Sequence, residues 1–198
     1  MGYLSQAPSL AVVRSAANRL YGKLFKMKKL VLIILTIIVL AIIIGLVYYF
    51  TPKDQKILMT IRGDSMEPTL KDGQKVLLNI DYYKRNPIKR GDITAFKFRT
   101  MKQPMVKRVI ALPKDKVEFK KDGIYVNGRK IKEDYLKNPN YQFTALGLKT
   151  ILIPLQANNN LVPDNSYLCL SDNRIRRNDS RQWGFLPKDY VIGKVEYK

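Results

Sequence analysis

The sequence predicts a mostly β protein: an antiparallel β-sheet domain with a smaller insertion rich in β-hairpins, preceded by one N-terminal transmembrane helix. The first observation behind this fold class is a run of 21 uncharged residues, Leu30 to Phe50, which is long enough to cross a bilayer as a helix. The second is a series of short apolar runs after this segment, several of which alternate with polar residues as strands do. The third is the pair of turn dipeptides Asp122-Gly123 and Asn127-Gly128, which are strong local signals for hairpins.

The apolar segment is predicted to be a retained anchor. A cleavable signal peptide has a shorter apolar core, whereas this segment ends in Tyr48-Tyr49-Phe50, an aromatic cluster typical of the membrane interface. Six basic residues precede the segment, and no acidic residue occurs before Asp54. The positive-inside rule therefore predicts a single-pass protein of the cell membrane with a cytoplasmic N-terminus. We expect a cytoplasmic basic tail at 1–29, the anchor at 30–50 and an extracytoplasmic domain at 51–198.

The basic tail leaves two interpretations open. Several apolar residues recur at helical spacing after Ser9, a candidate N-cap: Leu10, Val13, Ala17, Leu20 and Leu24. They would give a short amphipathic helix on the inner leaflet of the membrane. An unstructured basic tail fits the sequence equally well.

Beyond the anchor, the patterns favour strands. Ile57, Met59 and Ile61 alternate with other residues, which predicts a strand that runs into a turn at Gly63. Further strands are expected at Val76–Leu78, Ile93–Phe96, Met105–Leu112, Tyr167–Leu170 and Val191–Val195. Hairpin strands are expected at Val117–Phe119, Ile124–Val126 and Arg129–Ile131, inside an insertion subdomain at 113–161. The stretch Asn138–Asn160 has weaker periodicity and is expected to be a loop with one strand at Thr150–Leu155.

Composition excludes several kinds of site. With no histidine and one cysteine, the chain can form neither a Cys/His zinc site nor an intramolecular disulfide, and we predict no metal and no cofactor. Residues 51–198 hold 30 basic and 16 acidic residues. Such a charge is compatible with a nucleic-acid surface, but attraction to anionic lipid headgroups fits an anchored protein better. We therefore predict membrane lipid as a partner and no nucleic acid.

Ser65, at the turn after the first strand, is a candidate nucleophile, although a serine in such a turn is more often a turn former. Because the chain has no histidine, the remaining common base is a neutral lysine, as in the Ser-Lys variant of the catalytic triad. Lys107 is the best candidate among 24 lysines, since it lies on a strand face with Met105, Val109 and Ala111. Burial there would lower the lysine pKa. The alternative is an edge-strand lysine that extends to water.

Four motifs resemble, in sequence and in order, those of the type I signal peptidases, the bacterial Ser/Lys leader peptidase family. They are GDSMEPTL at 63–70, RGDI at 90–93, VKRVIALP at 106–113, and SDNR at 171–174 with DSRQWGF at 179–185. The resemblance covers Ile57 through Val195, nearly all of the outer domain. It implies a membrane-anchored serine endopeptidase that removes N-terminal signal peptides from exported precursor proteins and works beside the translocation machinery.

The resemblance also implies roles for particular residues. Ser65 would be the nucleophile, Lys107 the general base, and the Ser65 backbone N–H an oxyanion donor. Gly63 stands where some relatives carry a second, side-chain donor. Four residues would line shallow pockets for small substrate residues: Ile61, Met66, Leu70 and Val106. Five residues would give polar support: Asp172, Asn173, Arg174, Asp179 and Arg181. Two of them, Asp179 and Arg181 of the DSR motif, would form a buried pair.

One position departs from the family pattern. Arg177 stands where the family usually carries a serine that orients the lysine, and an arginine cannot accept a hydrogen bond. Either Ser180 or a shifted loop takes over this role, or the enzyme is slow or inactive. Two rivals follow: a cytoplasmic self-cleaving repressor, which the anchor argues against, and a non-catalytic membrane-tethered protein that binds peptides on the same fold.

Overall fold

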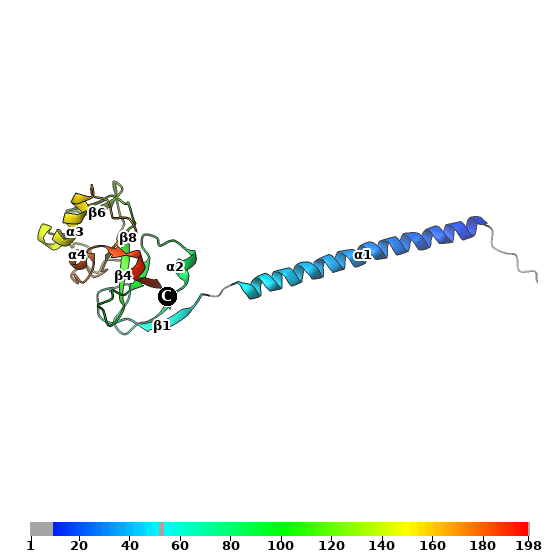
Figure 1. Cartoon of the computed structure of the whole chain (residues 1–198), viewed down its shortest axis with the longest axis horizontal. Helices are drawn as coiled ribbons and strands as arrows, with labels where there is room; N and C mark the ends of the chain where they lie inside the picture. The colour runs from blue at the N-terminus through cyan, green and yellow to red at the C-terminus, as the bar shows by residue number, and fades with distance from the viewer. Residues whose placement is uncertain (1–9, 52–53, 198) are drawn as a thin grey trace, which may run out of the picture. The chain divides into compact units, whose positions relative to one another are not determined.

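The computed structural model describes residues 10–51 and 54–197 (Figure 1). Its contacts divide the chain into two units, the second of which begins at Asp54. The described part of the first unit is almost entirely one 41-residue helix, α1 (Leu10–Phe50). From Asn18 to Phe50, α1 is long and apolar enough to cross a membrane, and it contains the predicted anchor. The chain is therefore helical, not unstructured, from Leu10 onward, while the predicted N-cap Ser9 lies outside the described residues.

In the second unit, the described residues form a larger, seven-stranded antiparallel sheet with the order β1-β2-β10-β3-β4-β8-β9. The predicted fold class is confirmed. The strands of this sheet are β1 (Lys56–Thr60), β2 (Lys75–Asn79), β3 (Ile93–Phe96), β4 (Met105–Ala111), β8 (Ser166–Leu170), β9 (Leu186–Pro187) and β10 (Val191–Glu196). Three short helices accompany them: α2 (Tyr82–Arg85), α4 (Ser180–Trp183) and the 3-10 helix η1 (Lys188–Tyr190).

The predicted hairpins form a second, three-stranded sheet of β5 (Val117–Lys120), β6 (Gly123–Val126) and β7 (Arg129–Lys130). Between β6 and β7, Asn127 and Gly128 have φ angles of 53° and 77°. Two consecutive left-handed residues are what a two-residue hairpin turn of type I′ requires, and Asn-Gly is its preferred sequence. The turn chemistry therefore sets this hairpin.

The predicted loop and strand at Asn138–Asn160 are wrong, because this stretch contains the helix α3 (Ala145–Ala157). Thr144 caps the helix, since its Oγ1 accepts a hydrogen bond from the Gly147 N–H at 3.1 Å. Thr150, Ile151 and Ile153 are β-branched residues that favour a strand, but three side chains at helical spacing are buried on one face of α3: Leu148, Ile151 and Leu155. Burial of that face outweighs the local strand preference.

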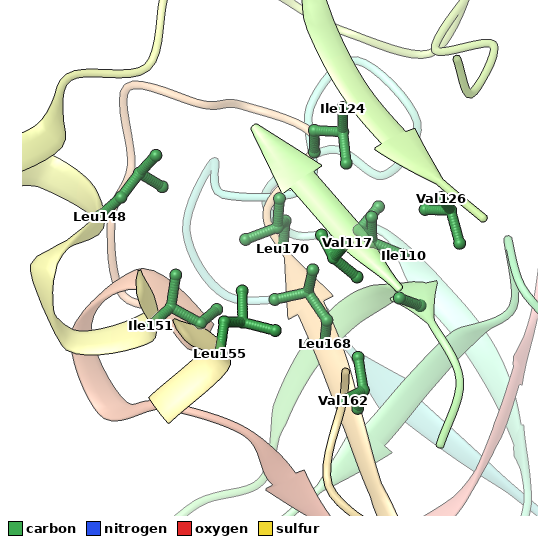
Figure 2. Close-up of a cluster of buried hydrophobic side chains, with 11 residues drawn as sticks. Ile110, Val117, Ile124, Val126, Leu148, Ile151, Leu155, Val162, Leu168 and Leu170 are labelled. Carbon is green, nitrogen blue, oxygen red and sulfur yellow. The ribbon is translucent and has the colours of Figure 1, made fainter. Parts of the chain in front are cut away.

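Figure 2 shows where this helix packs. The buried cluster joins the α3 side chains to Val117, Ile124 and Val126 of the smaller sheet and to Ile110, Leu168 and Leu170 of the larger one. The two sheets therefore share a hydrophobic core. The division into tail, anchor and outer domain, with 113–161 as a separate subdomain, stays a prediction.

Candidate active site

Ser65 lies in the loop that follows β1. At Gly63 the backbone has a φ angle of 79°, a left-handed conformation that favours glycine, and the Gly63 N–H donates to Asp72 Oδ1 at 2.7 Å. Met66 and Leu70 anchor the loop because both pack into a buried cluster with side chains of β2, β3 and β10. Ser65 itself stays half-buried, so the loop presents its hydroxyl at the boundary between core and solvent.

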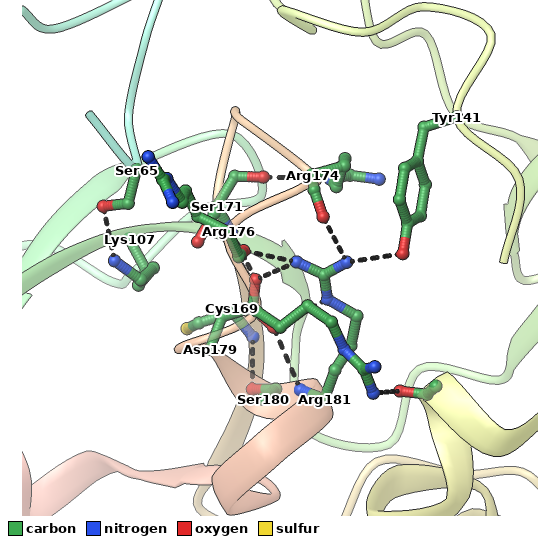
Figure 3. Close-up of polar contacts among 12 residues, drawn as sticks. Ser65, Lys107, Tyr141, Cys169, Ser171, Arg174, Arg176, Asp179, Ser180 and Arg181 are labelled. Carbon is green, nitrogen blue, oxygen red and sulfur yellow. Dashed lines mark hydrogen bonds and ion pairs between the residues drawn. The ribbon is translucent and has the colours of Figure 1, made fainter. Parts of the chain in front are cut away.

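Lys107 approaches this hydroxyl from β4. Its Nζ lies 2.9 Å from Ser65 Oγ (Figure 3) and 2.9 Å from the carbonyl oxygen of Val106. The side chain of Lys107 is buried. This burial lowers the pKa of Lys107 from 10.5 to about 8, although the nearby carboxylates of Asp179 and Asp172 favour the charged form. A neutral amine, which can accept a proton, is therefore populated in the mildly alkaline range.

The predicted apolar face around Lys107 is confirmed in part. Met105 and Val109 pack together in one hydrophobic cluster. Ala111 instead packs beside Ile110 in the cluster of Figure 2, which lies between the two sheets. The reason is that the register between β4 and β8 shifts between Val109 and Ala111. A bulge of this kind breaks the alternation of sides on which the prediction rested.

All five residues predicted to give polar support are buried: Asp172, Asn173, Arg174, Asp179 and Arg181. Asp179 and Arg181 form the predicted buried pair, with contacts of 2.8 Å from Nε and 2.6 Å from Nη2 (Figure 3). Asp179 also accepts the Ser171 N–H at 2.9 Å, and Arg181 donates to the carbonyl of Arg174 at 2.7 Å. The pair therefore fixes the backbone of the loop 171–179, whose Asn173 N–H donates to the Ser65 carbonyl at 3.0 Å.

Asp172 holds the opposite side of the nucleophile loop. It accepts hydrogen bonds from Arg108 Nε at 2.8 Å and Nη2 at 2.6 Å, and from Thr69 Oγ1 at 2.5 Å. The motif comparison assigned Arg108 no role. The sequence nevertheless contained a signal for a role of Arg108, because an arginine within an apolar strand is almost never buried without a partner. In the structure, Arg108 is only 7% exposed.

Ser65 and Lys107 open into a cleft of about 390 Å³. Among the predicted pocket residues, Ile61, Met66 and Val106 line this cleft, whereas Leu70 lies outside the lining and is fully buried in the core. Arg176 and Asn178 contribute from the opposite loop. A larger cavity of about 730 Å³ is lined by other residues and contains neither Ser65 nor Lys107.

Most of the chain matches a known protein family. Residues 27–198 match the family described as signal peptidase, peptidase S26. The chain belongs to this signal peptidase family. Its relatives include signal peptidase IB of Staphylococcus aureus, 40% identical over 145 residues, which are 70% of this chain and 75% of that protein. Signal peptidase I of Bacillus caldolyticus is 38% identical over 140 residues, which are 70% and 76% of the two chains.

Among solved structures, the crystal structure of a signal peptidase I from Enterococcus faecalis aligns with a TM-score of 0.46 and 36% identity, over 56% of this chain and 98% of that one. The predicted family and activity are confirmed by the family match and the two relatives: this signal peptidase is a membrane-anchored serine endopeptidase that cleaves signal peptides. The non-catalytic alternative is not favoured.

In this signal peptidase, Arg177 is turned away from the lysine. Its Nη2 donates to the carbonyl of Gly147 in α3 at 2.9 Å. Ser180 does not take over in the described residues, since its Oγ accepts the Cys169 N–H at 2.9 Å and forms no hydrogen bond with Lys107. Among the described residues 54–197, Lys107 Nζ forms hydrogen bonds with Ser65 Oγ and with the Val106 carbonyl, so the lysine is held by its own strand and by the serine itself.

Proposed function

We propose that Ser65 and Lys107 perform the cleavage as nucleophile and general base. The observation that carries this proposal is the 2.9 Å distance between Ser65 Oγ and the Nζ of a buried lysine at the floor of an open cleft. A nucleophile needs a base within hydrogen-bond reach, and the chain has no histidine to serve as one.

The reaction follows the usual order of acyl transfer. Neutral Lys107 Nζ takes the proton of Ser65 Oγ–H as Oγ attacks the carbonyl carbon of the last signal-peptide residue. The resulting ammonium then returns a proton to the leaving nitrogen, which becomes the N-terminus of the mature protein. A water molecule, deprotonated by Lys107 in the same way, hydrolyses the acyl-enzyme and frees Ser65.

The Ser65 N–H is free to bind the oxyanion, because it donates no hydrogen bond within the described residues 54–197. Gly63 has no side chain to act as a second donor. Each oxyanion donor typically changes the rate by ~10²–10³. On the nucleophile loop, stabilisation of the oxyanion therefore comes from one backbone group, the Ser65 N–H.

Two open strand edges would hold an extended precursor. β1 is the edge strand of the larger sheet and pairs on one side with β2. In β4, the segment Met105–Lys107 pairs with β3, whereas the pairing with β8 starts only at Arg108. Both segments line the cleft. A precursor strand can therefore pair its main chain here, as in β-strand addition.

The pockets favour small residues at the first and third positions before the cut. A precursor with alanine at both positions is expected to lose at least about tenfold in kcat/KM when both become leucine, because the cleft walls of Ile61, Met66 and Val106 cannot accommodate the longer side chains. The measurement is cleavage of matched synthetic precursors, with an Ala→Leu change at the second position as the control. Equal cleavage of all three peptides contradicts this pocket assignment.

The pH dependence tests the role of Lys107. The folded pKa of Lys107 is lowered to about 8 by burial, and only the neutral amine accepts a proton. We therefore expect kcat/KM to rise with pH, to reach half of its plateau near pH 8 and to fall about tenfold for each pH unit below pH 7. A profile that is flat down to pH 5 contradicts a lysine base.

The anchor defines where the reaction takes place. The basic residues before α1's apolar part and the absence of acids there support an N-terminus in the cytoplasm and an outer domain beyond the membrane. The positive charge of the outer domain supports contact with anionic lipid, and the location supports work beside the translocation machinery.

A further inference from the structure

An ion pair reaches the nucleophile loop from the far side of the cleft. The carboxylate of Asp64, directly before Ser65, accepts hydrogen bonds from Arg176 Nε at 2.8 and 3.0 Å and from Nη2 at 2.8 Å. This is a forked contact, the geometry in which arginine fixes a carboxylate in both position and orientation. Arg176 also lines the cleft that contains Ser65 and Lys107.

The base of Arg176 is rigid although its side chain is 57% exposed. Its carbonyl oxygen accepts a hydrogen bond from Arg181 Nη2 at 2.7 Å, and its N–H donates to Asn173 at 3.0 Å. Arg181 and Asn173 are both buried. The guanidinium of Arg176 therefore extends from a fixed backbone to the residue beside the nucleophile.

The lysine has little else to orient it. Arg177 occupies the family's serine position but contacts α3, and Lys107 Nζ contacts the Val106 carbonyl and Ser65 Oγ. The 2.9 Å approach of Oγ to Nζ therefore depends on how firmly the loop holds Ser65. Small errors in such an approach lower the rate of the chemical step strongly.

We propose that Arg176 is a positioning residue: through Asp64 it holds Ser65 where its hydroxyl meets Lys107. The inference rests on the proposed Ser65–Lys107 mechanism. An exposed ion pair adds little to global stability, so the contribution of Arg176 belongs to the geometry of the loop. It therefore affects kcat rather than folding or substrate affinity.

The test uses the full chain in detergent micelles and a synthetic precursor with alanine at the first and third positions before the cut. Arg176→Ala and Asp64→Asn are each expected to lower kcat about fivefold, the upper range for an exposed pair, with KM and melting temperature unchanged. The double variant is expected to be no slower than either single one, because both remove the same contact. Arg176→Lys, which keeps the charge but not the fork, is expected to recover part of kcat.

Arg177→Ala is the matched control, since this neighbouring arginine contacts Gly147 and not the nucleophile loop, and we expect wild-type kcat. Salt gives an independent readout: kcat of the wild type should fall as ionic strength rises, whereas kcat of Arg176→Ala should not respond.

Several results overturn the positioning role: wild-type kcat in Arg176→Ala, a change in KM alone, additive losses in the double variant, or a melting temperature that falls with kcat. Ser65→Ala, measured in parallel, separates the two proposals. If Ser65→Ala is inactive and Arg176→Ala has wild-type kcat, only the positioning role fails. If Ser65→Ala still cleaves, the Ser65–Lys107 mechanism fails and the positioning role fails with it.

Discussion

Replacing Ser65 with alanine or Lys107 with methionine is expected to abolish cleavage of a synthetic Ala-x-Ala precursor, a loss on the order of 10⁴-fold or more. The two losses should be similar in size, because the proposed mechanism uses Ser65 Oγ and Lys107 Nζ, 2.9 Å apart, as one unit. The measurement is the single-turnover rate of cleavage by the full chain in detergent micelles.

Melting temperatures separate chemistry from folding. The folded pKa of Lys107 lies near 8, below its ordinary value of 10.5, so burial of the ammonium opposes folding. This penalty is fully present below pH 8, shrinks as the pH rises from 8 to 10.5 and is absent above 10.5. At pH 7, Lys107→Met should therefore be at least as stable as the wild type.

Ser166→Ala and Lys97→Met, outside the cleft lining, are the matched controls and should keep full activity. Near-wild-type cleavage by Lys107→Met would exclude lysine from the mechanism.

Replacing Asp179 with alanine is expected to lower the free energy of unfolding by ~3–5 kcal/mol, because it leaves the guanidinium of Arg181 buried without its carboxylate. The Ser171 N–H loses its acceptor in the same step. Activity should fall too, since this loop holds Ser65 through Asn173. The measurement is urea unfolding, followed by the fluorescence of Trp183, which is the only tryptophan in the sequence and lies in the same short helix as Arg181.

Asp164→Ala is the control for Asp179→Ala. Asp164 pairs with Lys114 at 3.8 Å, but both side chains are at least 70% exposed, so its loss should change stability very little. An Asp179→Ala variant that is fully stable and active would contradict the supporting role of the buried pair.

Much of the fold could be predicted from the sequence, because the patterns that specify these elements lie within short stretches of the chain. Leu30–Phe50 forms part of a helix since an uncharged run of that length has few other stable states, and Asn127-Gly128 turns the β6–β7 hairpin since its residues tolerate left-handed backbone. The alternation in β1 and β4 predicted these strands. The motifs also identified Ser65 and Lys107 as partners, and the structure brings their side chains together.

Other features depend on contacts between distant segments, which local patterns do not contain. α3 is a helix because Leu148, Ile151 and Leu155 are buried against strands of both sheets, so long-range packing outweighs the strand preference of its β-branched residues.

The partners of Arg176 and Arg177 were decided in the same way. Arg177 donates a hydrogen bond to the Gly147 carbonyl in α3 instead of facing the lysine. Its neighbour Arg176 pairs with Asp64, 112 residues earlier in the chain. By itself, the sequence determined the membrane anchor, the β fold and the pair of residues proposed to react. The tertiary structure alone decided how that pair is held, because the direction of a charged side chain depends on which carboxylate or carbonyl the folded chain brings within reach.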